Sequence, residues 1–178
     1  MPSSAGTEPR AAGVIGSGTS RIHVRPATVH DLDAVMELRL ALLREHAEHP
    51  VYGRLRTDVS QRARELFATQ LRSTSESIFL AECEGIVAGI LRIVDSIGSP
   101  LLDPARYAYV SSVYVRPDAR RRGVLRAMLN AADAWSRARG LTQMRLHNVV
   151  GSASAEGSWA ALGFAVVEQV RLRCLDPR

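Results

Sequence analysis

The spacing of apolar residues in the first half of the chain changes from a strand period to a helix period. Apolar and polar residues alternate over Ile22–Arg25, and the alternation ends at Pro26, which predicts a first strand. Apolar residues then recur about every three or four positions, which predicts a helix capped by Thr28 or Asp31 and a second helix over Val59–Arg72. The intervening stretch contains proline and glycine and breaks the pattern, so we expect a loop between the helices.

The second half alternates between the same two patterns. Glu84-Gly85 lies between two apolar runs and predicts a hairpin. The expected elements are strands at Ser77–Glu82, Ile86–Val94 and Tyr107–Val115, a helix over Gly123–Arg139 ended by Gly140, a strand at Gln143–Val149, a helix at Ala153–Leu162 and a last strand at Phe164–Leu172. Strands and helices alternate after an antiparallel front half, which predicts a mixed α/β domain over residues 21–178 that follows a flexible tail at 1–20.

Composition excludes several classes of protein. The 178 residues are 46% hydrophobic and 23% charged, which is typical of globular proteins and excludes collagen-like, mucin-like and wholly disordered chains. No uncharged apolar run approaches the ~20 residues of a membrane-spanning helix, and the tail has no secretory pattern. Cys83 and Cys174 form neither a disulfide scaffold nor a metal motif, so we expect reduced core thiols in a cytoplasmic protein, and no bound metal.

Charge points to an anionic partner. All 23 basic residues are arginines, and against 18 acidic residues they give a net charge of +5. Many of them gather where the strand ending at Val115 enters a turn at Pro117 and Gly123 opens a helix. Unpaired N–H groups at a helix start, together with the helix dipole, attract phosphate oxygens, whereas clustered positive charge there is otherwise unfavourable. Phosphate binding is the prediction, and an RNA-binding turn is the alternative.

The same turn resembles motif A of the GNAT superfamily of N-acetyltransferases. Arg120, Gly123 and Leu125 occupy the three motif positions in order, with Leu125 where glycine or alanine is usual. The resemblance implies that the turn holds the pyrophosphate of acetyl-CoA through its N–H groups and that the preceding strand pairs with the pantetheine arm. It assigns to the cofactor Arg120, Arg121, Arg122, Gly123, Val124, Leu125 and Arg126 in the turn, and Val113, Tyr114 and Val115 on the strand.

A second segment resembles motif B of the same family. The matching residues are His147 and Asn148 on a strand, then Ala155, Trp159 and Leu162-Gly163-Phe164 at the end of a helix. The resemblance covers Ile22–Leu172 and adds Asn148, Ser152 and Trp159 to the cofactor contacts. It implies a twisted, mostly antiparallel sheet of about six or seven strands with helices on both faces and a splayed central strand pair.

The usual catalytic residues of that family are absent. Ser111 and Ser112 stand where a carboxylate is common, and Trp159 stands where the tyrosine that protonates the thiolate is common. The candidates for accepting the amine proton and for protonating the thiolate are Tyr109, Tyr114, His147 and Glu82. The catalytic set that we expect is Tyr109, His147 and Trp159. Tyr109 and Tyr114 are an odd number of residues apart, so they fall on opposite faces unless a bulge intervenes.

The function we expect is transfer of the acetyl group of acetyl-CoA to a primary amine of a small molecule or peptide. The first alternative is a catalytically weak acetyl-CoA sensor of the same fold, and the second is a nucleic-acid-binding domain that uses Arg116–Arg126. Glu45 and Glu48 would favour a cationic amine, but the acceptor stays open. The apolar last strand suggests a homodimer, and no membrane partner is expected.

Overall fold

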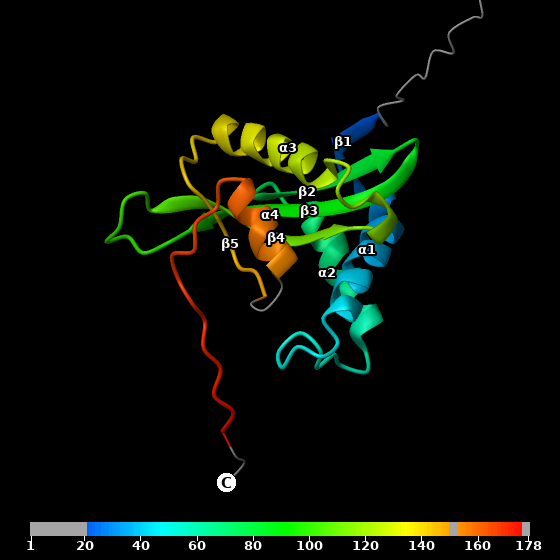
Figure 1. Ribbon diagram of the computed structural model, residues 1–178, viewed down its shortest axis with the longest axis horizontal. Helices are drawn as coiled ribbons and strands as arrows, with labels where there is room; N and C mark the ends of the chain where they lie inside the picture. The colour runs from blue at the N-terminus through cyan, green and yellow to red at the C-terminus, as the bar shows by residue number, and fades with distance from the viewer. Residues whose placement is uncertain (1–20, 150–152, 176–178) are drawn as a thin grey trace, which may run out of the picture.

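The computed structural model describes residues 21–149 and 153–175, which build a mixed α/β fold around one five-stranded sheet (Figure 1). The strands lie in chain order: β1 (Ile22–Pro26), β2 (Glu76–Cys83), β3 (Ile86–Ile97), β4 (Arg106–Val115) and β5 (Met144–Leu146). The pairs from β1 to β4 are antiparallel, and β4 and β5 are parallel. The predicted fold class is therefore confirmed.

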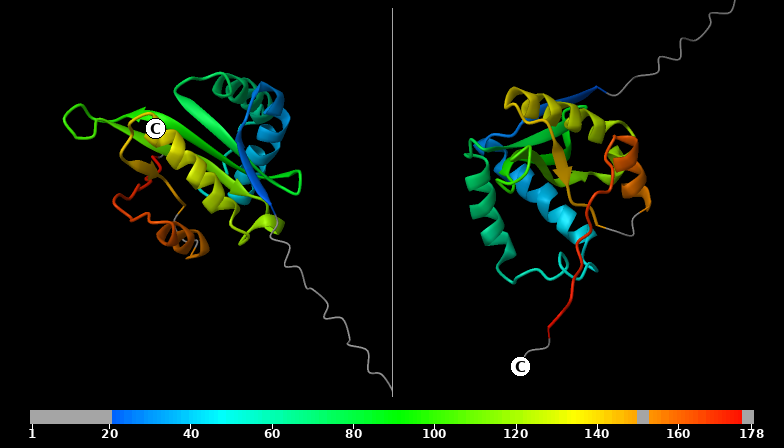
Figure 2. Two further views of the ribbon diagram at one scale, coloured as in Figure 1. Left: turned by 90° about the horizontal axis from the view of Figure 1, so that it is seen from above. Right: turned by 90° about the vertical axis from the view of Figure 1, so that its left-hand side faces the viewer.

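Helices cover both faces of the sheet, as expected. Helices α1 (Leu32–Glu45) and α2 (Val59–Gln70) lie on one face, and α3 (Val124–Ala138) lies on the other (Figure 2). Each face has its own hydrophobic cluster, because alternate strand residues point to opposite sides. Ile90 packs toward α1 and α2, whereas its neighbour Leu91 packs toward α3.

Helix ends lie where the sequence predicts them. Thr28 caps the short 3-10 helix Val29–Asp31 that leads into α1, and the Asp31 carboxylate accepts a hydrogen bond from the Thr28 N–H. Helix α3 is followed by Gly140 at φ 68°, and α4 (Ala153–Ala161) by Gly163 at φ 88°. Both glycines adopt the left-handed conformation that ends helices.

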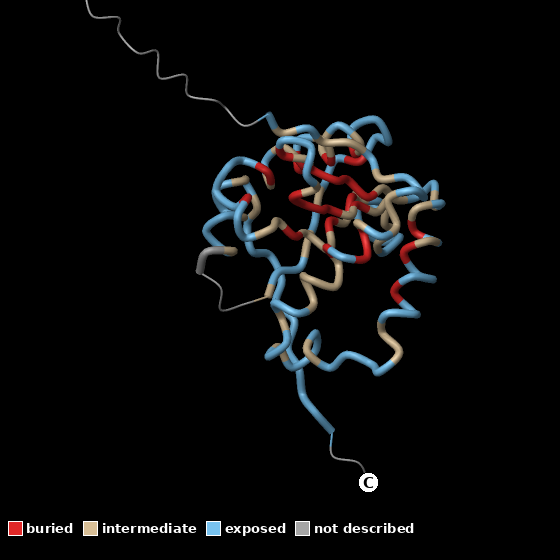
Figure 3. Tube along the Cα trace, turned by 90° about the vertical axis from the view of Figure 1, so that its right-hand side faces the viewer, coloured by how far each residue is buried: buried red, intermediate tan, exposed pale blue. Residues whose placement is uncertain are grey.

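The predicted last strand is wrong. Residues Phe164–Leu172 are extended but pair with no strand among the described residues, so the sheet has five strands rather than about six or seven. Val167 is 89% exposed and Val170 80%, and Figure 3 shows the segment exposed along almost its whole length. Apolar alternation gives a segment strand propensity, but it does not supply a partner strand. For the same reason Cys174 is exposed and is not a core thiol, whereas Cys83 is buried.

Two predictions concern residues that the structure does not describe. The tail at residues 1–20 and Ser152 lie outside the described residues. The organisation as a single domain over 21–178 stays a prediction.

Candidate cofactor site and active site

Strand β4 carries a bulge in its second half. Ser111 lies opposite Arg92 of β3 and Tyr114 lies opposite Ile90, so β4 has one more residue than β3 between these pairs. Ser112 has φ 53°, a left-handed conformation that absorbs the additional residue. The bulge places Tyr109 and Tyr114 on the same face despite their odd spacing, the face toward α1 and α2.

The β4–β5 pair is short, which leaves part of β4 open. Ala108–Val110 pairs with Met144–Leu146, and β5 ends there. Ser111–Val115 therefore pairs with β3 on one side only within the described residues. The backbone groups on the other side of Ser111–Val115, which include those of Val113 and the N–H of Val115, are available to an extended ligand arm, whereas the Val115 carbonyl accepts a hydrogen bond from Arg120.

The turn after β4 brings this open edge to the start of α3. Arg121 has φ 60° and Gly123 has φ 89°, so the chain makes two left-handed steps before Val124. Val124 is buried and anchors the helix start, whereas Gly123 is exposed, and a Cβ added to Gly123 would meet only the Ile22 side chain among the described residues, at 3.8 Å. The first N–H groups of a helix have no acceptor within it, so those of Val124, Leu125 and Arg126 suit an anion.

Several arginines of the turn already pair with carboxylates from other elements. Arg116 donates to Glu37 of α1 at 2.6 Å, and Arg120 donates to Glu45 of α1 and to the Val115 carbonyl at 2.9 Å. Arg122 pairs with Glu84 at 3.4 Å. The turn is thereby held against α1 and the β2–β3 hairpin.

Arg121 and Arg126 differ from these arginines. Neither side chain forms a hydrogen bond or ion pair with any described residue, although both lie in the segment with the open N–H groups. Leu125 is partly buried against the α3-side cluster, which includes its buried helix neighbours Leu129 and Ala132. The bulky Leu125 side chain is thus accommodated in the core.

Two of the three expected catalytic residues lie together. The Tyr109 hydroxyl is 3.1 Å from Nδ1 of His147, and the two rings meet edge to face at 5.5 Å. Burial is the main cause that raises the pKa of the Tyr109 hydroxyl, with smaller contributions from Tyr52 and Tyr107, while the charge of Arg92 opposes the shift. Tyr109 is therefore protonated at neutral pH, and the pair lies just where β4 and β5 separate.

The remaining candidates lie elsewhere. Trp159 packs in the α3-side cluster and meets Phe164 edge to face at 5.4 Å, on the other side of the sheet from Tyr109. Tyr114 is buried in the opposite cluster, and Asn148 is exposed after β5. Glu82 pairs with Arg25 at 2.8 Å near the far edge of the sheet, which separates it from the Tyr109–His147 pair.

The sequence analysis missed a polar cluster on the α1/α2 face. The Arg92 guanidinium pairs with Glu76 and donates to the Ser111 hydroxyl at 3.1 Å. Arg39 of α1 lies over the Phe67 ring at 4.3 Å and donates to Gln70 at 3.3 Å. These residues come from five different elements, α1, α2, β2, β3 and β4, so no local sequence pattern could identify them. The only sequence signal was the occurrence of charged residues at inward-facing positions of apolar strands.

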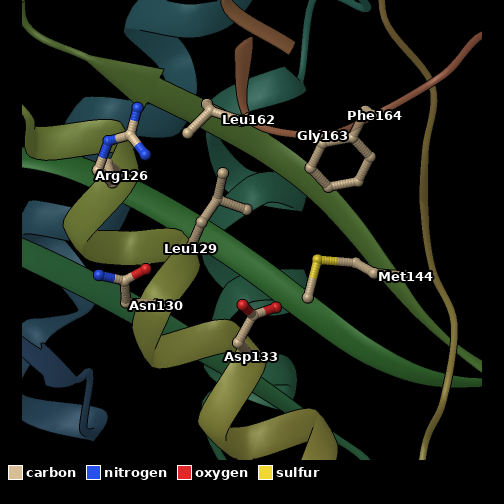
Figure 4. A pocket seen from close by; sticks show the side chains of 8 residues that line it. All are labelled: Arg126, Leu129, Asn130, Asp133, Met144, Leu162, Gly163 and Phe164. Carbon is tan, nitrogen blue, oxygen red and sulfur yellow. The ribbon is translucent and has the colours of Figure 1, made fainter. Parts of the chain in front are cut away.

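A cavity of about 320 Å³ lies on the opposite face, between α3, β5 and the end of α4. Its lining is shown in Figure 4, where Arg126 and Asp133 project from α3 at opposite ends, and Leu129, Met144 and Phe164 supply apolar walls. Arg126 belongs both to this cavity and to the helix start. The cavity therefore adjoins the turn that opens α3.

The described part of the chain contains neither a metal centre nor a membrane span. No group of three or more histidine, cysteine, aspartate or glutamate side chains there could hold a metal ion. None of the described helices has the length and apolar character needed to cross a membrane.

Comparisons with known proteins agree with this geometry. The profile of the Acetyltransferase (GNAT) family matches residues 35–164. An aminoglycoside N(6')-acetyltransferase type 1 of Klebsiella aerogenes is 38% identical over 64 residues, which span 36% of this chain and 42% of that protein. The chain thus matches less than half the length of that relative.

Two solved structures have the same fold. A predicted acetyltransferase from Clostridium acetobutylicum, crystallised with acetyl-CoA, has a TM-score of 0.69 and 18% identity, over 86% of this chain and 96% of its own. The aminoglycoside N-acetyltransferase AAC(6')-Iy in complex with CoA has a TM-score of 0.70 and 21% identity, over 90% of this chain and all (100%) of its own.

Proposed function

Because the chain belongs to the Acetyltransferase (GNAT) family, whose enzymes use acetyl-CoA as acetyl donor, we propose that it acetylates a primary amine of a small molecule or peptide. The observation that carries the proposal is the junction of the open β4 edge with the start of α3. Backbone groups of Val113 and Val115 would hold the pantetheine arm, and the N–H groups around Gly123 would hold the pyrophosphate. Asn148, Ser152 and Trp159 complete the proposed cofactor contacts.

The Tyr109–His147 pair supplies a route for both protons of the reaction. We infer that Nδ1–H of His147 donates to the Tyr109 oxygen, which leaves Nε2 to take a proton from the attacking amine. As the C–N bond forms and the C–S bond breaks, Tyr109 gives its hydroxyl proton to the departing thiolate. The Nδ1 proton then passes to the Tyr109 oxygen, which leaves both side chains neutral and the proton of His147 on Nε2. Proton exchange with solvent at the exposed His147 ring restores the Nδ1–H form for the next turnover. Trp159, on the other face, is better placed to support the cofactor side than to donate a proton.

Calorimetric titration with acetyl-CoA and dephospho-CoA, followed by a thiol-release assay over a panel of amines, tests the proposal. We expect micromolar binding of acetyl-CoA and amine-dependent release of CoA. Tyr109→Phe and His147→Gln should each lower kcat about 100-fold and leave acetyl-CoA affinity unchanged. Full activity in both variants would refute the proton route, and absence of acetyl-CoA binding would refute the function.

Two other functions make different predictions. A sensor of the same fold would bind acetyl-CoA and release no CoA with any amine; the serines at the carboxylate positions of β4 favour this alternative. A nucleic-acid-binding domain would bind oligonucleotides with steep salt dependence and would not be stabilised by CoA. The carboxylates paired with Arg116, Arg120 and Arg122 reduce the charge available for that role.

An aminoglycoside is one candidate acceptor, because the Klebsiella aerogenes relative is named for that activity.

We also propose that the chain forms a homodimer in which the exposed segment Phe164–Leu172 pairs with a second copy. Light scattering on the whole chain and on a Val167→Asp variant tests this, since a charge in the pairing strand should dissociate the dimer. A cytoplasmic location stays a prediction.

A further inference from the structure

Four polar and aromatic side chains form a strip along the paired part of β4 and β5. Tyr109 lies directly opposite Arg145 in the parallel register. Tyr107 and His147 lie two residues away along their own strands, so all four side chains share one face of the sheet. Tyr107 and Tyr109 are half-buried, whereas Arg145 and His147 are exposed. This β4–β5 strip is therefore accessible to a ligand beside the proposed proton route.

The guanidinium of the strip is held by neutral groups. Arg145 lies over the Tyr107 ring at 4.0 Å and donates a hydrogen bond of 2.9 Å to the side-chain oxygen of Gln143. Among the described residues no carboxylate forms an ion pair with Arg145. The ring and the amide restrict the orientation of the guanidinium, which lowers the entropy cost of a further contact. Arg145 thus offers an oriented positive charge that no counter-ion neutralises.

Two carboxylates on the neighbouring strands do not neutralise this charge. Glu76 of β2 lies on the same face of the sheet but is paired with Arg92. Asp95 of β3 alternates with Ile93 of the α3-side cluster, so it faces away from the strip, and it is paired with Arg106.

The loop after α1 carries one carboxylate that is free to bind a cation. Glu48 is exposed and forms no ion pair within the part of the chain that the structure describes, whereas Glu45 and Asp58 on either side of it are paired with arginines. Glu48 lies outside the sheet, whereas Arg145 is the register partner of Tyr109. The unneutralised charge that the strands place next to the reacting pair is therefore positive.

We propose that the acceptor carries an anionic group, a carboxylate or a phosphate, in addition to its amine, and that Arg145 binds this group. A guanidinium presents parallel N–H donors that match either anion. Two residues of a strand span about 7 Å, so the anionic group would lie at least about that far from an amine at His147. The acceptor class is thus an extended amino carboxylate, a short peptide with a free C-terminus or an aminoalkyl phosphate.

This inference rests on the proposed acetyltransferase activity. Arg145 is a specificity residue that contacts the substrate away from the reacting atoms. A polycationic acceptor would meet like charge on the strip, and Glu48 would be its counter-ion instead.

Acceptors of equal length test the inference. We compare 6-aminohexanoate and 6-aminohexyl phosphate with the neutral 6-aminohexanamide, and use kanamycin and spermidine as polycations. The wild-type kcat/KM should be about 3- to 5-fold higher for at least one anionic acceptor than for the amide, mainly through KM, because an exposed charge pair contributes up to about that factor. Arg145→Met keeps an apolar contact with the Tyr107 ring and should reduce this ratio to about 1 without changing the rate with the amide.

Arg139→Met is the matched control. Arg139 is also exposed and lies over an aromatic ring, that of Trp135 at 3.9 Å, but it follows α3 on the other face of the sheet. This variant should keep the wild-type preference, as should Glu48→Gln. Equal kcat/KM for both anionic acceptors and the amide, an unchanged ratio in Arg145→Met, or a preference for the polycations that Glu48→Gln abolishes would each overturn the inference.

Failure of the enzymatic proposal is distinguishable from failure of this one. If no amine is acetylated, NMR titration of the whole chain with 6-aminohexanoate, 6-aminohexyl phosphate and 6-aminohexanamide still tests the subsite. Tighter binding of an anionic compound that is lost in Arg145→Met and kept in Arg139→Met would support the anion site without turnover. Equal affinity of the wild-type protein for the three compounds would overturn it.

Discussion

A matched pair of substitutions at Gly123 isolates the electrostatic part of cofactor binding. Asparagine and aspartate have nearly the same shape, and both tolerate the left-handed conformation that Gly123 adopts at φ 89°. The site has room, because a Cβ there meets only the Ile22 side chain, at 3.8 Å. We expect each variant to lose about 1 kcal/mol of folding stability relative to glycine, because a side chain strains the left-handed conformation, and Gly123→Asp to lose slightly less because a negative charge at a helix start is favourable.

The two variants should differ in affinity for acetyl-CoA. A carboxylate about 6 Å from one phosphate charge is repelled by about 3 kcal/mol at an effective dielectric constant of about 20. Gly123 is exposed, so solvent and salt reduce this to about 1–2 kcal/mol, or about a 10-fold higher Kd for Gly123→Asp than for Gly123→Asn. Calorimetric titration in low and moderate salt measures the difference, with thermal unfolding as the check on folding. Equal affinities of the two variants in low salt would refute the placement of the pyrophosphate at this turn.

Three further predictions concern stability and charge. Arg25 holds the pKa of Asp31 well below its usual range, so Asp31→Asn should cost about 2 kcal/mol of unfolding free energy at neutral pH. Urea titrations should show this difference shrinking as the pH falls below about 4, because the carboxylate of the unfolded chain then becomes protonated. Gly89→Ala should cost about 1–2 kcal/mol in the same assay, because its Cβ would lie 3.0 Å from a Val124 methyl and 3.2 Å from a backbone oxygen of β4; no loss would show that α3 shifts freely. Arg121→Gln should raise the Kd for acetyl-CoA about 10-fold and Arg120→Gln at most about 3-fold, because the Arg120 guanidinium already pairs with a carboxylate. A larger effect of Arg120→Gln in calorimetry would refute the assignment of Arg121 to the cofactor.

Patterning predicted most of the fold because the determinants are local. The spacing of apolar residues, together with capping and turn residues, located α1, α2 and the β2–β3 hairpin. Gly140 and Gly163 end helices as expected. The last strand failed because strand formation requires a neighbour, and the alternation at Phe164–Leu172 contains no information on which edge it meets.

The site was only partly predictable for a similar reason. The turn around Gly123 is one contiguous segment, so its residue types identify it. The bulge at Ser112 reverses the face of every later residue on β4, and a serine at φ 53° has no distinctive sequence signal. Arg92 meets Glu76 and Ser111 only after β2, β3 and β4 pair, so this polar cluster could not be inferred from residue spacing.

Helix α1 holds two arginines of the turn that leads into α3. Its outward-facing carboxylates Glu37 and Glu45 pair with Arg116 and Arg120, while Arg39 on the same helix contacts Phe67 and Gln70 of α2. Part of the charge of the turn is therefore compensated before any cofactor binds, and a pyrophosphate must compete with these carboxylates for the same guanidinium groups. The net gain then comes mainly from the backbone N–H groups and from Arg121.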